Sequence, residues 1–159
     1  MPSEEVLYID GGQPLRGEAL AQGSKNATLP MLAASLLASE GVTVLRRVPP
    51  VKDVLVALEV LRRLGAVVDY DAVEEVASID ATRVNSTSLP DELTARFRAS
   101  LLFVGPLLAR FRKAQIKEIG GCSIGQRPWD IHHRGFARLG ATVEGKSGGG
   151  IEVCAKDLR

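Results

Sequence analysis

The feature that most constrains the fold of this chain is an internal repeat. RRLGAVVDYD begins at Arg62 and ARLGATVEG begins at Ala137, and their glycines, Gly65 and Gly140, lie 75 residues apart. Similarity at a fixed period is typical of chains that stack copies of one supersecondary unit, none of which buries its apolar face alone. We therefore expect two related units that pack against each other.

The order of apolar patterns is the same in both halves. Helix-like LPMLAASLLA and SLLFVGPLLARF each precede a strand-like segment, a second helix-like run and two closing strand-like segments. This order predicts an α/β fold of repeated βαβαββ units, the first over residues 1–82 with an N-terminal strand and the second over 83–159. Two units form a marginal core, and the last residues follow a strand-like segment directly. A third unit is therefore expected to follow in a larger protein.

Two finer patterns refine this prediction. Glycines at the ends of the helix-like runs, Gly41, Gly65 and Gly140, are expected to act as C-caps. Apolar residues at helical spacing predict that the helix before Gly65 buries one face. These residues are Val54, Leu55, Leu58, Leu61 and Leu64.

Composition is that of a soluble globular protein, with 159 residues, 45% of them hydrophobic and 25% charged. The N-terminus lacks the apolar core of a signal peptide, and the longest apolar runs are too short to span a membrane. These features predict a cytoplasmic protein whose two cysteines are free thiols. Cys154 alternates with its neighbours on a strand-like segment and is expected in the core.

Charge is distributed unevenly along the chain. Residues 1–82 hold seven Lys or Arg and twelve Asp or Glu, whereas residues 83–138 hold ten and four. The second half could favour an anionic ligand, or it could present a solvated basic face. A nucleic-acid partner is not expected, because the basic residues form no run and no aromatic stacking motif accompanies them.

The loop GGCSIGQRP, residues 120–128, is the first candidate for chemistry. Two glycines give Cys122 a flexible backbone, and Arg127 precedes a helix-like segment. A cation and a helix N-terminus both lower the pKa of a nearby thiol, which favours a reactive cysteine. The alternative is a small apolar cysteine that fills a gap in the core.

The segment GSKNATLP, residues 23–30, is the second candidate. Ser24 or Asn26 can cap a helix, and Pro30 is expected within its first turn, so the helix should begin near Asn26. Lys25 then stands at a helix N-terminus, which is unfavourable for a cation unless an anion shares the site. The alternative is an ordinary surface lysine. Arg98 occupies the equivalent turn of the second unit and could grip a carboxylate or phosphate with two hydrogen bonds.

No pattern in the sequence indicates a metal or an organic cofactor. His132 and His133 are adjacent and cannot share one helix face as ligands. No other Cys or His spacing suggests a metal site, and neither a phosphate-binding loop nor a dinucleotide fingerprint is present.

Together these motifs resemble the UDP-N-acetylglucosamine enolpyruvyl transferases. GSKNATLP, RASLLFVGPLLARF, and GGCSIGQRPWDIH followed by GFARLGA carry the resemblance, which runs from Gly11 to the last residues. It implies an inside-out α/β fold with two domains of three βαβαββ units each. A third unit and a second domain would then be absent from this chain, and a C-terminal portion or companion chain would be a partner.

The resemblance also implies an activity. Members of that family transfer enolpyruvyl from phosphoenolpyruvate to the 3-hydroxyl of UDP-N-acetylglucosamine and release phosphate, the first committed step of bacterial peptidoglycan synthesis. They need no organic cofactor and no obligatory metal. The related shikimate-pathway transferases share the fold but lack the cysteine loop around Cys122. The remaining alternative is a truncated paralogue that acts as a non-catalytic binding module.

Specific residues carry roles by the same resemblance. Lys25, Arg98 and Arg127 correspond to ligands of phosphoenolpyruvate, and Asn26 to a contact of the sugar nucleotide. Cys122 corresponds to the thiol that can form an adduct with phosphoenolpyruvate and that fosfomycin modifies. The segment expected to line the uridine pocket comprises Pro128, Trp129, Asp130 and Ile131. Trp129 departs from the pattern, in which a smaller aliphatic residue is expected, and the proton-abstracting aspartate of the family lies outside this chain.

Overall fold

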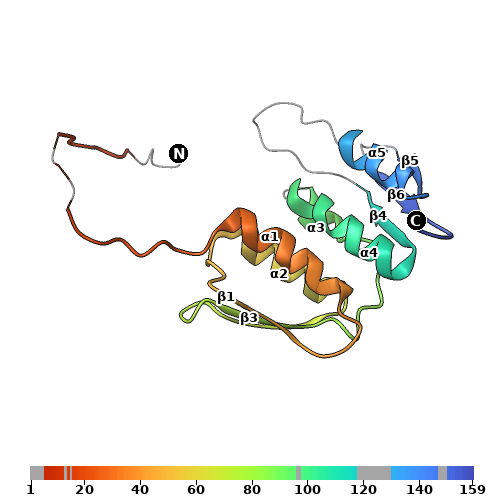
Figure 1. Cartoon of the computed structure of the whole chain (residues 1–159), viewed down its shortest axis with the longest axis horizontal. Coiled ribbons are helices and arrows are strands. Elements are labelled where there is room, and N and C mark those ends of the chain that lie inside the picture. The colour runs from red at the N-terminus through yellow and green to blue at the C-terminus, as the bar shows by residue number, and fades with distance from the viewer. Residues whose placement is uncertain (1–5, 13, 15, 96–97, 118–129, 147–149) are drawn as a thin grey trace.

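A computed structural model describes residues 6–12, 14, 16–95, 98–117, 130–146 and 150–159 (Figure 1). The first half of the chain contains α1 (Lys25–Ala34), the 3₁₀ helix η1 (Ser35–Leu37), β1 (Thr43–Arg46), α2 (Lys52–Arg63), β2 (Val67–Asp71) and β3 (Val76–Asp80). The second half contains α3 (Asp91–Thr94), the 3₁₀ helix η2 (Arg98–Phe103), α4 (Val104–Phe111), β4 (Lys113–Ile116), α5 (Asp130–Arg138), β5 (Thr142–Gly145) and β6 (Ile151–Cys154).

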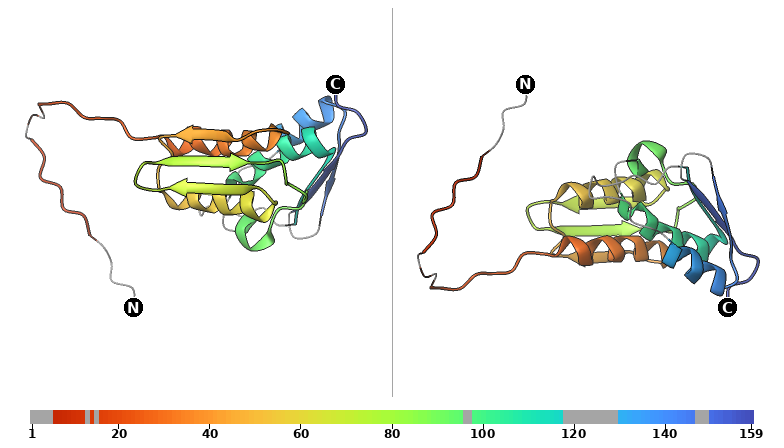
Figure 2. Two further views of the ribbon diagram at one scale, coloured as in Figure 1. Left: turned by 90° about the horizontal axis from the view of Figure 1, so that it is seen from below. Right: turned by 90° about the horizontal axis from the view of Figure 1, so that it is seen from above.

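The predicted repeat and the α/β class are both confirmed. The described strands form two antiparallel three-stranded sheets, in the order β1-β3-β2 and in the order β4-β6-β5. In each sheet the last strand of the unit lies in the middle, so the two units have the same topology. Figure 2 shows α1 and α2 together on one face of the first sheet. No helix among the described residues is long and apolar enough to cross a bilayer.

The leading strand predicted for each unit is not formed as expected. In the N-terminal segment, residues 6–12 have no described strand pairing, and Val6, Leu7, Tyr8 and Ile9 are 62–90% exposed. In the second unit the leading strand is reduced to one parallel bridge between Ser88 and Gln115. A strand needs a partner for its backbone N–H and C=O groups, and residues 6–12 extend away from the folded body (Figures 1 and 2).

Two of the three predicted glycine caps are confirmed. Gly65 and Gly140 follow α2 and α5 with φ of 103° and 92°, the left-handed conformation that glycine adopts without strain. The prediction for Gly41 is wrong. The first helix already ends at Ala34 and continues as η1 to Leu37, so Gly41 lies in the loop before β1.

The buried face of α2 differs in one position from the predicted stripe. Val54, Leu58, Leu61 and Leu64 are buried as expected, whereas Leu55 is 45% exposed. Ala57 and Val60 of the same helix are also buried, and both are inaccessible to solvent. The helix contacts the sheet on one side and α1 on another, so its buried surface is wider than a single stripe.

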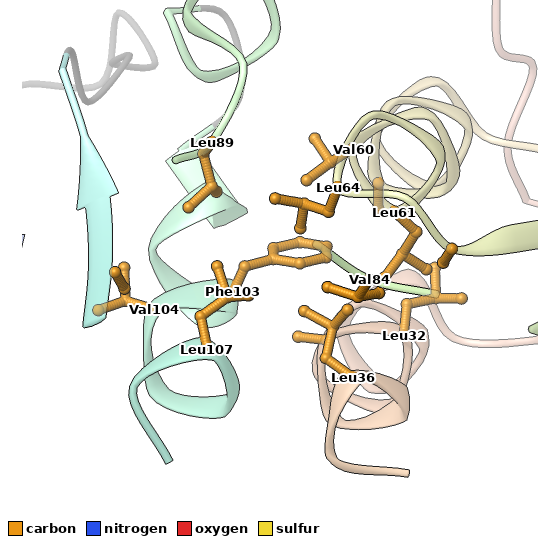
Figure 3. Packing of buried hydrophobic residues seen from close by; sticks show 14 of the residues in the cluster. Leu32, Leu36, Val60, Leu61, Leu64, Val84, Leu89, Phe103, Val104 and Leu107 are labelled. Carbon is orange, nitrogen blue, oxygen red and sulfur yellow. The ribbon is translucent and has the colours of Figure 1, made fainter. Parts of the chain in front are cut away.

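Both units contribute to one core. The aromatic ring of Phe103, at the end of η2, points away from its own unit and toward Leu64 of α2 (Figure 3). Leu36 of the first unit and Leu107 of the second lie on either side of this region in the same view. All four side chains are inaccessible to solvent. Neither unit buries these surfaces alone, as the repeat predicts.

A half-buried arginine joins the two units by hydrogen bonds. The Nη1 of Arg110, in the last turn of α4, donates to the carbonyl oxygens of Leu36 at 2.9 Å, Ala38 at 3.2 Å and Ala81 at 2.9 Å. Its guanidinium also lies 4.9 Å from the ring centroid of Phe111. Carbonyl groups at the end of a helix lack intrahelical partners, and Arg110 supplies a charged donor for them.

We predict that Arg110→Met destabilises the protein by about 3 kcal/mol, because buried carbonyl groups lose a charged donor. Urea-induced unfolding of the two proteins measures the difference. Arg138→Met, an exposed change in the last turn of α5, is the control and should cost less than about 1 kcal/mol. Equal stability of Arg110→Met and the native protein would show that these contacts do not hold the units together.

The outer face of the second sheet carries an ion-pair network. Glu152 accepts from Lys113 Nζ at 2.7 Å and from Lys146 Nζ at 2.9 Å, and Lys146 also pairs with Glu144 at 3.3 Å. Cys154 lies on this same face, because it alternates with buried Val153, so its predicted place in the core is wrong. The predicted alternation of buried and exposed side chains along β6 is confirmed, but Cys154 lies on the face opposite to the predicted one.

The hydrogen bonds from Lys113 and Lys146 lower the pKa of Glu152 from its ordinary value of 4.5 to about 2. The lower folded-state value means that the ionised carboxylate stabilises the fold above pH 4.5, and that this contribution is lost as the pH falls toward 2.

We predict that the stability difference between the native protein and Glu152→Gln is constant above about pH 5 and shrinks below it. Unfolding free energies measured from pH 2 to 6 test this. A difference that stays constant down to pH 2 would contradict it, and 1 M salt should reduce the effect.

Candidate anion-binding end of the molecule

The first candidate segment forms the start of α1. Ser24 is the N-cap, with its Oγ accepting from the backbone N–H of Ala27 at 3.3 Å, which decides between the two predicted caps. The helix begins at Lys25, one residue from the predicted start. Pro30 lies inside the helix, in its second turn. The prediction that it lies within the first turn is therefore wrong. The helix remains continuous past it, with Leu32 and Ala33 buried.

Lys25 projects from this helix start toward the start of α2. Its Nζ lies 2.9 Å from Oδ2 of Asp53, and both side chains are a little under half exposed. Asp53 stands in the first turn of α2, which packs beside α1. The pair therefore joins two helix N-termini at one end of the molecule. The sequence did not indicate Asp53 as a partner of Lys25, because an acid in a first helical turn is ordinarily explained by the helix dipole.

Arg98 belongs to a segment that packs beside α1. It begins η2, which packs on α1, while the far end of α4 contacts η1 through Arg110. The segment from η2 to α4 therefore runs in the same direction as the segment from α1 to η1 (Figure 1). Arg98 is half-buried and engaged in an interaction. The prediction that Lys25 and Arg98 occupy equivalent turns of the two units stays a prediction.

The strand before the cysteine loop returns toward this end. Lys117, directly after β4, pairs through its Nζ with Oδ2 of Asp91 at 2.8 Å, which fixes the end of the strand beside the start of α3. The loop itself lies outside the described residues. The predictions for Cys122, Arg127, Pro128 and Trp129 therefore remain predictions.

The other predicted site residues are described and exposed. Asn26 lies in the first turn of α1 beside Lys25. Asp130 and Ile131 form the start of α5, where Asp130 accepts from Arg134 at 3.3 Å and Ile131 is 71% exposed. The prediction that these residues line a uridine pocket stays a prediction.

The backbone of Gly23, two residues before Lys25, lies very close to the backbone of Arg47. A Cβ added there would collide with the backbone carbonyl of Arg47, in the loop after β1, and would lie 3.1 Å from Cδ of Pro49. Arg47 itself has a positive φ of 57°. The loop after β1 is thus pressed against the residues that cap α1, and it leads directly into the helix that carries Asp53.

We predict that Gly23→Ala destabilises the protein by about 2 kcal/mol, because the β1 loop must move away from the start of α1. Thermal or urea unfolding checks the change. Gly105→Ala, in α4, is the matched control, since no atom lies within 4 Å of its added Cβ. That control should be neutral or stabilising. If both variants had the native stability, the close packing of Gly23 against Arg47 would be incorrect.

The chemistry of this end suits an anion. The N-termini of α1 and α2 meet there, and each offers backbone N–H groups and a partial positive charge. Lys25 adds a full cation that is accessible to solvent. Among the described residues, no group of three His, Cys, Asp or Glu side chains could hold a metal ion.

Comparisons with solved structures define the class of fold. The enolpyruvyl transferase NikO from Streptomyces tendae is similar with a TM-score of 0.74 and 26% sequence identity, over 93% of this chain and 32% of that chain. An EPSP synthase from Acinetobacter baumannii shares the fold, with a TM-score of 0.55 and 13% identity over 90% of this chain and 33% of that chain. The fold is therefore that of the enolpyruvyl transferases, as the sequence predicted.

The family follows from the sequence comparisons. The model of the family EPSP synthase (3-phosphoshikimate 1-carboxyvinyltransferase) matches residues 9–159, so the chain belongs to this family. A UDP-N-acetylglucosamine 1-carboxyvinyltransferase of Thermobifida fusca is 49% identical over 144 residues, 88% of this chain. UDP-N-acetylglucosamine 1-carboxyvinyltransferase 1 of Carboxydothermus hydrogenoformans is 42% identical over 155 residues, 98% of this chain. The chain spans 33% and 36% of the length of these two relatives.

Proposed function

We propose that this chain is the N-terminal portion of a UDP-N-acetylglucosamine 1-carboxyvinyltransferase. The observation that carries the proposal is the placement of Lys25 at a joined pair of helix N-termini, with Arg98 at the start of η2, which packs on α1. Phosphoenolpyruvate carries a carboxylate and a phosphate, and such an end matches both with cations and backbone donors. Relatives with this activity in their names are 42–49% identical to the chain.

In the proposed reaction, Lys25, Arg98 and Arg127 hold phosphoenolpyruvate, and Asn26 contacts the sugar nucleotide. A proton adds to the methylene carbon of phosphoenolpyruvate, which leaves positive character at the neighbouring carbon. The 3-hydroxyl of UDP-N-acetylglucosamine attacks that carbon and loses its proton, which gives a tetrahedral intermediate with a methyl group. The methyl group then loses a proton and phosphate leaves, so that the carbon–carbon double bond of the enol ether forms. Cationic side chains fixed before the reaction stabilise the phosphate as it departs.

Cys122 is proposed to act at the carbon centre. A thiol on a loop can donate the proton to the methylene carbon, and its thiolate can capture the neighbouring carbon as a covalent adduct. The glycines that precede it, Gly120 and Gly121, permit the backbone to approach a ligand closely. Pro128, Trp129, Asp130 and Ile131 are proposed to line the uridine pocket, with exposed Ile131 as its apolar contact.

The chain supplies only part of the proposed site. It spans about a third of its relatives, and the aspartate expected to take the proton from the 3-hydroxyl lies in the remaining portion. That portion, in the same polypeptide or in a companion chain, is therefore a proposed partner, and turnover by the chain alone is expected to be negligible. A cytoplasmic location belongs to the same proposal, because phosphoenolpyruvate and nucleotide sugars are cytoplasmic metabolites.

We predict that fosfomycin modifies this chain once, on Cys122. The thiolate opens the epoxide ring and forms one carbon–sulfur bond, so the mass rises by that of one inhibitor molecule. Intact-mass spectrometry followed by peptide mapping checks this. Half-buried Cys154, on the outer face of the second sheet, is the internal comparison for ordinary thiol reactivity.

Two variants separate the outcomes of this labelling. Cys122→Ala should remain unmodified, and Cys154→Ala should be modified like the native chain. Modification of Cys154 instead of Cys122, or equal modification of both, would contradict a selective site at Cys122. No modification at all would favour the non-catalytic binding module that the sequence analysis left as an alternative.

A further inference from the structure

We propose that Asp53 is a positioning residue for Lys25, which holds the lysine ammonium over the start of α1 where the substrate anion binds. This inference rests on the proposed function, because it concerns the same substrate. It adds a residue from a different helix, which neither the sequence motifs nor their resemblance pointed to. The juxtaposition that supports it is the 2.9 Å contact between Lys25 Nζ and Asp53 Oδ2.

The ammonium needs such a partner where it stands. Lys25 is the first residue of α1, and the partial positive charge of a helix N-terminus disfavours a cation there. The lysine side chain has several freely rotating bonds, so an unpaired ammonium would swing toward solvent. Asp53 lies in the first turn of the neighbouring helix, where a carboxylate is itself favoured by the dipole of α2. The carboxylate is therefore well placed to hold the ammonium at this position.

The contact leaves Lys25 able to bind a ligand. An ammonium group has three N–H donors, and the contact with Asp53 uses one of them. The side chain of Lys25 is 47% exposed, so the other two donors are accessible from solvent. A phosphate or carboxylate oxygen can thus bind the ammonium without displacing Asp53.

A simpler electrostatic view predicts the opposite effect. If Asp53 acted only as a nearby negative charge, it would repel phosphoenolpyruvate, and its neutralisation would tighten binding. If it positions the ammonium, neutralisation weakens binding even though a repelling charge is lost. The sign of the change in affinity therefore distinguishes the two roles.

The experiment is an NMR titration of the whole chain with phosphoenolpyruvate, in the native protein and in Asp53→Asn. The Nζ signal of Lys25, assigned through its loss in Lys25→Met, reports the ion pair before any ligand is added. We expect Asp53→Asn to shift that signal and to raise the Kd for phosphoenolpyruvate threefold to tenfold. Asp53→Glu, which keeps the carboxylate, should restore the affinity to within about threefold of native.

Glu59→Gln is the matched control. Glu59 is on the same helix and pairs with Arg62 at 3.6 Å and with Arg63 at 2.9 Å, so the variant removes one carboxylate and two ion pairs farther along α2. It should leave both the Lys25 signal and the Kd within twofold of native. A merely structural effect of lost charge on α2 would appear in both variants.

The remaining outcomes overturn one proposal or the other. An unchanged Lys25 signal in Asp53→Asn, or an unchanged or lower Kd, would refute the positioning role while leaving the proposed function in place. A native chain that does not perturb Lys25 at any phosphoenolpyruvate concentration would count against the proposed function, and the role of Asp53 would fall with it.

Discussion

The packing of η2 and α4 against α1 and η1 is the contact on which the rest of this structure depends. Phe103 fills the space between the units, and Arg110 bonds to carbonyl oxygens at the far end of the same contact. These two interactions keep the segment from η2 to α4 parallel to the segment from α1 to η1. The contact sets two segments side by side, one that begins with Lys25 and one that begins with Arg98.

The repeat therefore has a chemical consequence as well as a structural one. Lys25 begins α1 in the first unit and Arg98 begins η2 in the second, and η2 packs on α1. In the proposed function, a ligand with two separated negative groups would meet a cation from each unit. Helix N-termini add backbone donors that need no reorganisation when the ligand binds. The proposed anion site would thus depend on the duplication of one unit and on how the copies pack.

The sequence predicted local structure more accurately than it predicted contacts between distant residues. The order of the inner strands, the caps at Gly65 and Gly140, and the helix start near Asn26 depend on nearest neighbours and turn chemistry. The structure confirms the strand order and the two caps, and the helix begins one residue before Asn26. The leading strands depend on a partner strand, which the pattern alone cannot supply. Leu55 and Cys154 were misplaced because alternation and helical spacing give the period of burial but not which neighbour covers each face.

Asp53 illustrates the same limit at the candidate site. Its position in a first helical turn has an ordinary explanation in the dipole of α2, so nothing in the sequence connected it with Lys25, 28 residues earlier. Only the packing of α1 beside α2 joins them. In water a pair of charges about 4 Å apart gains roughly 1 kcal/mol, and at an effective dielectric of about 20 roughly 4 kcal/mol. The half-exposed pair belongs near the weaker limit, so its stabilising contribution is small. Its value lies in where it holds the ammonium, because a charge fixed in place before binding spares the ligand the entropy of ordering a flexible side chain.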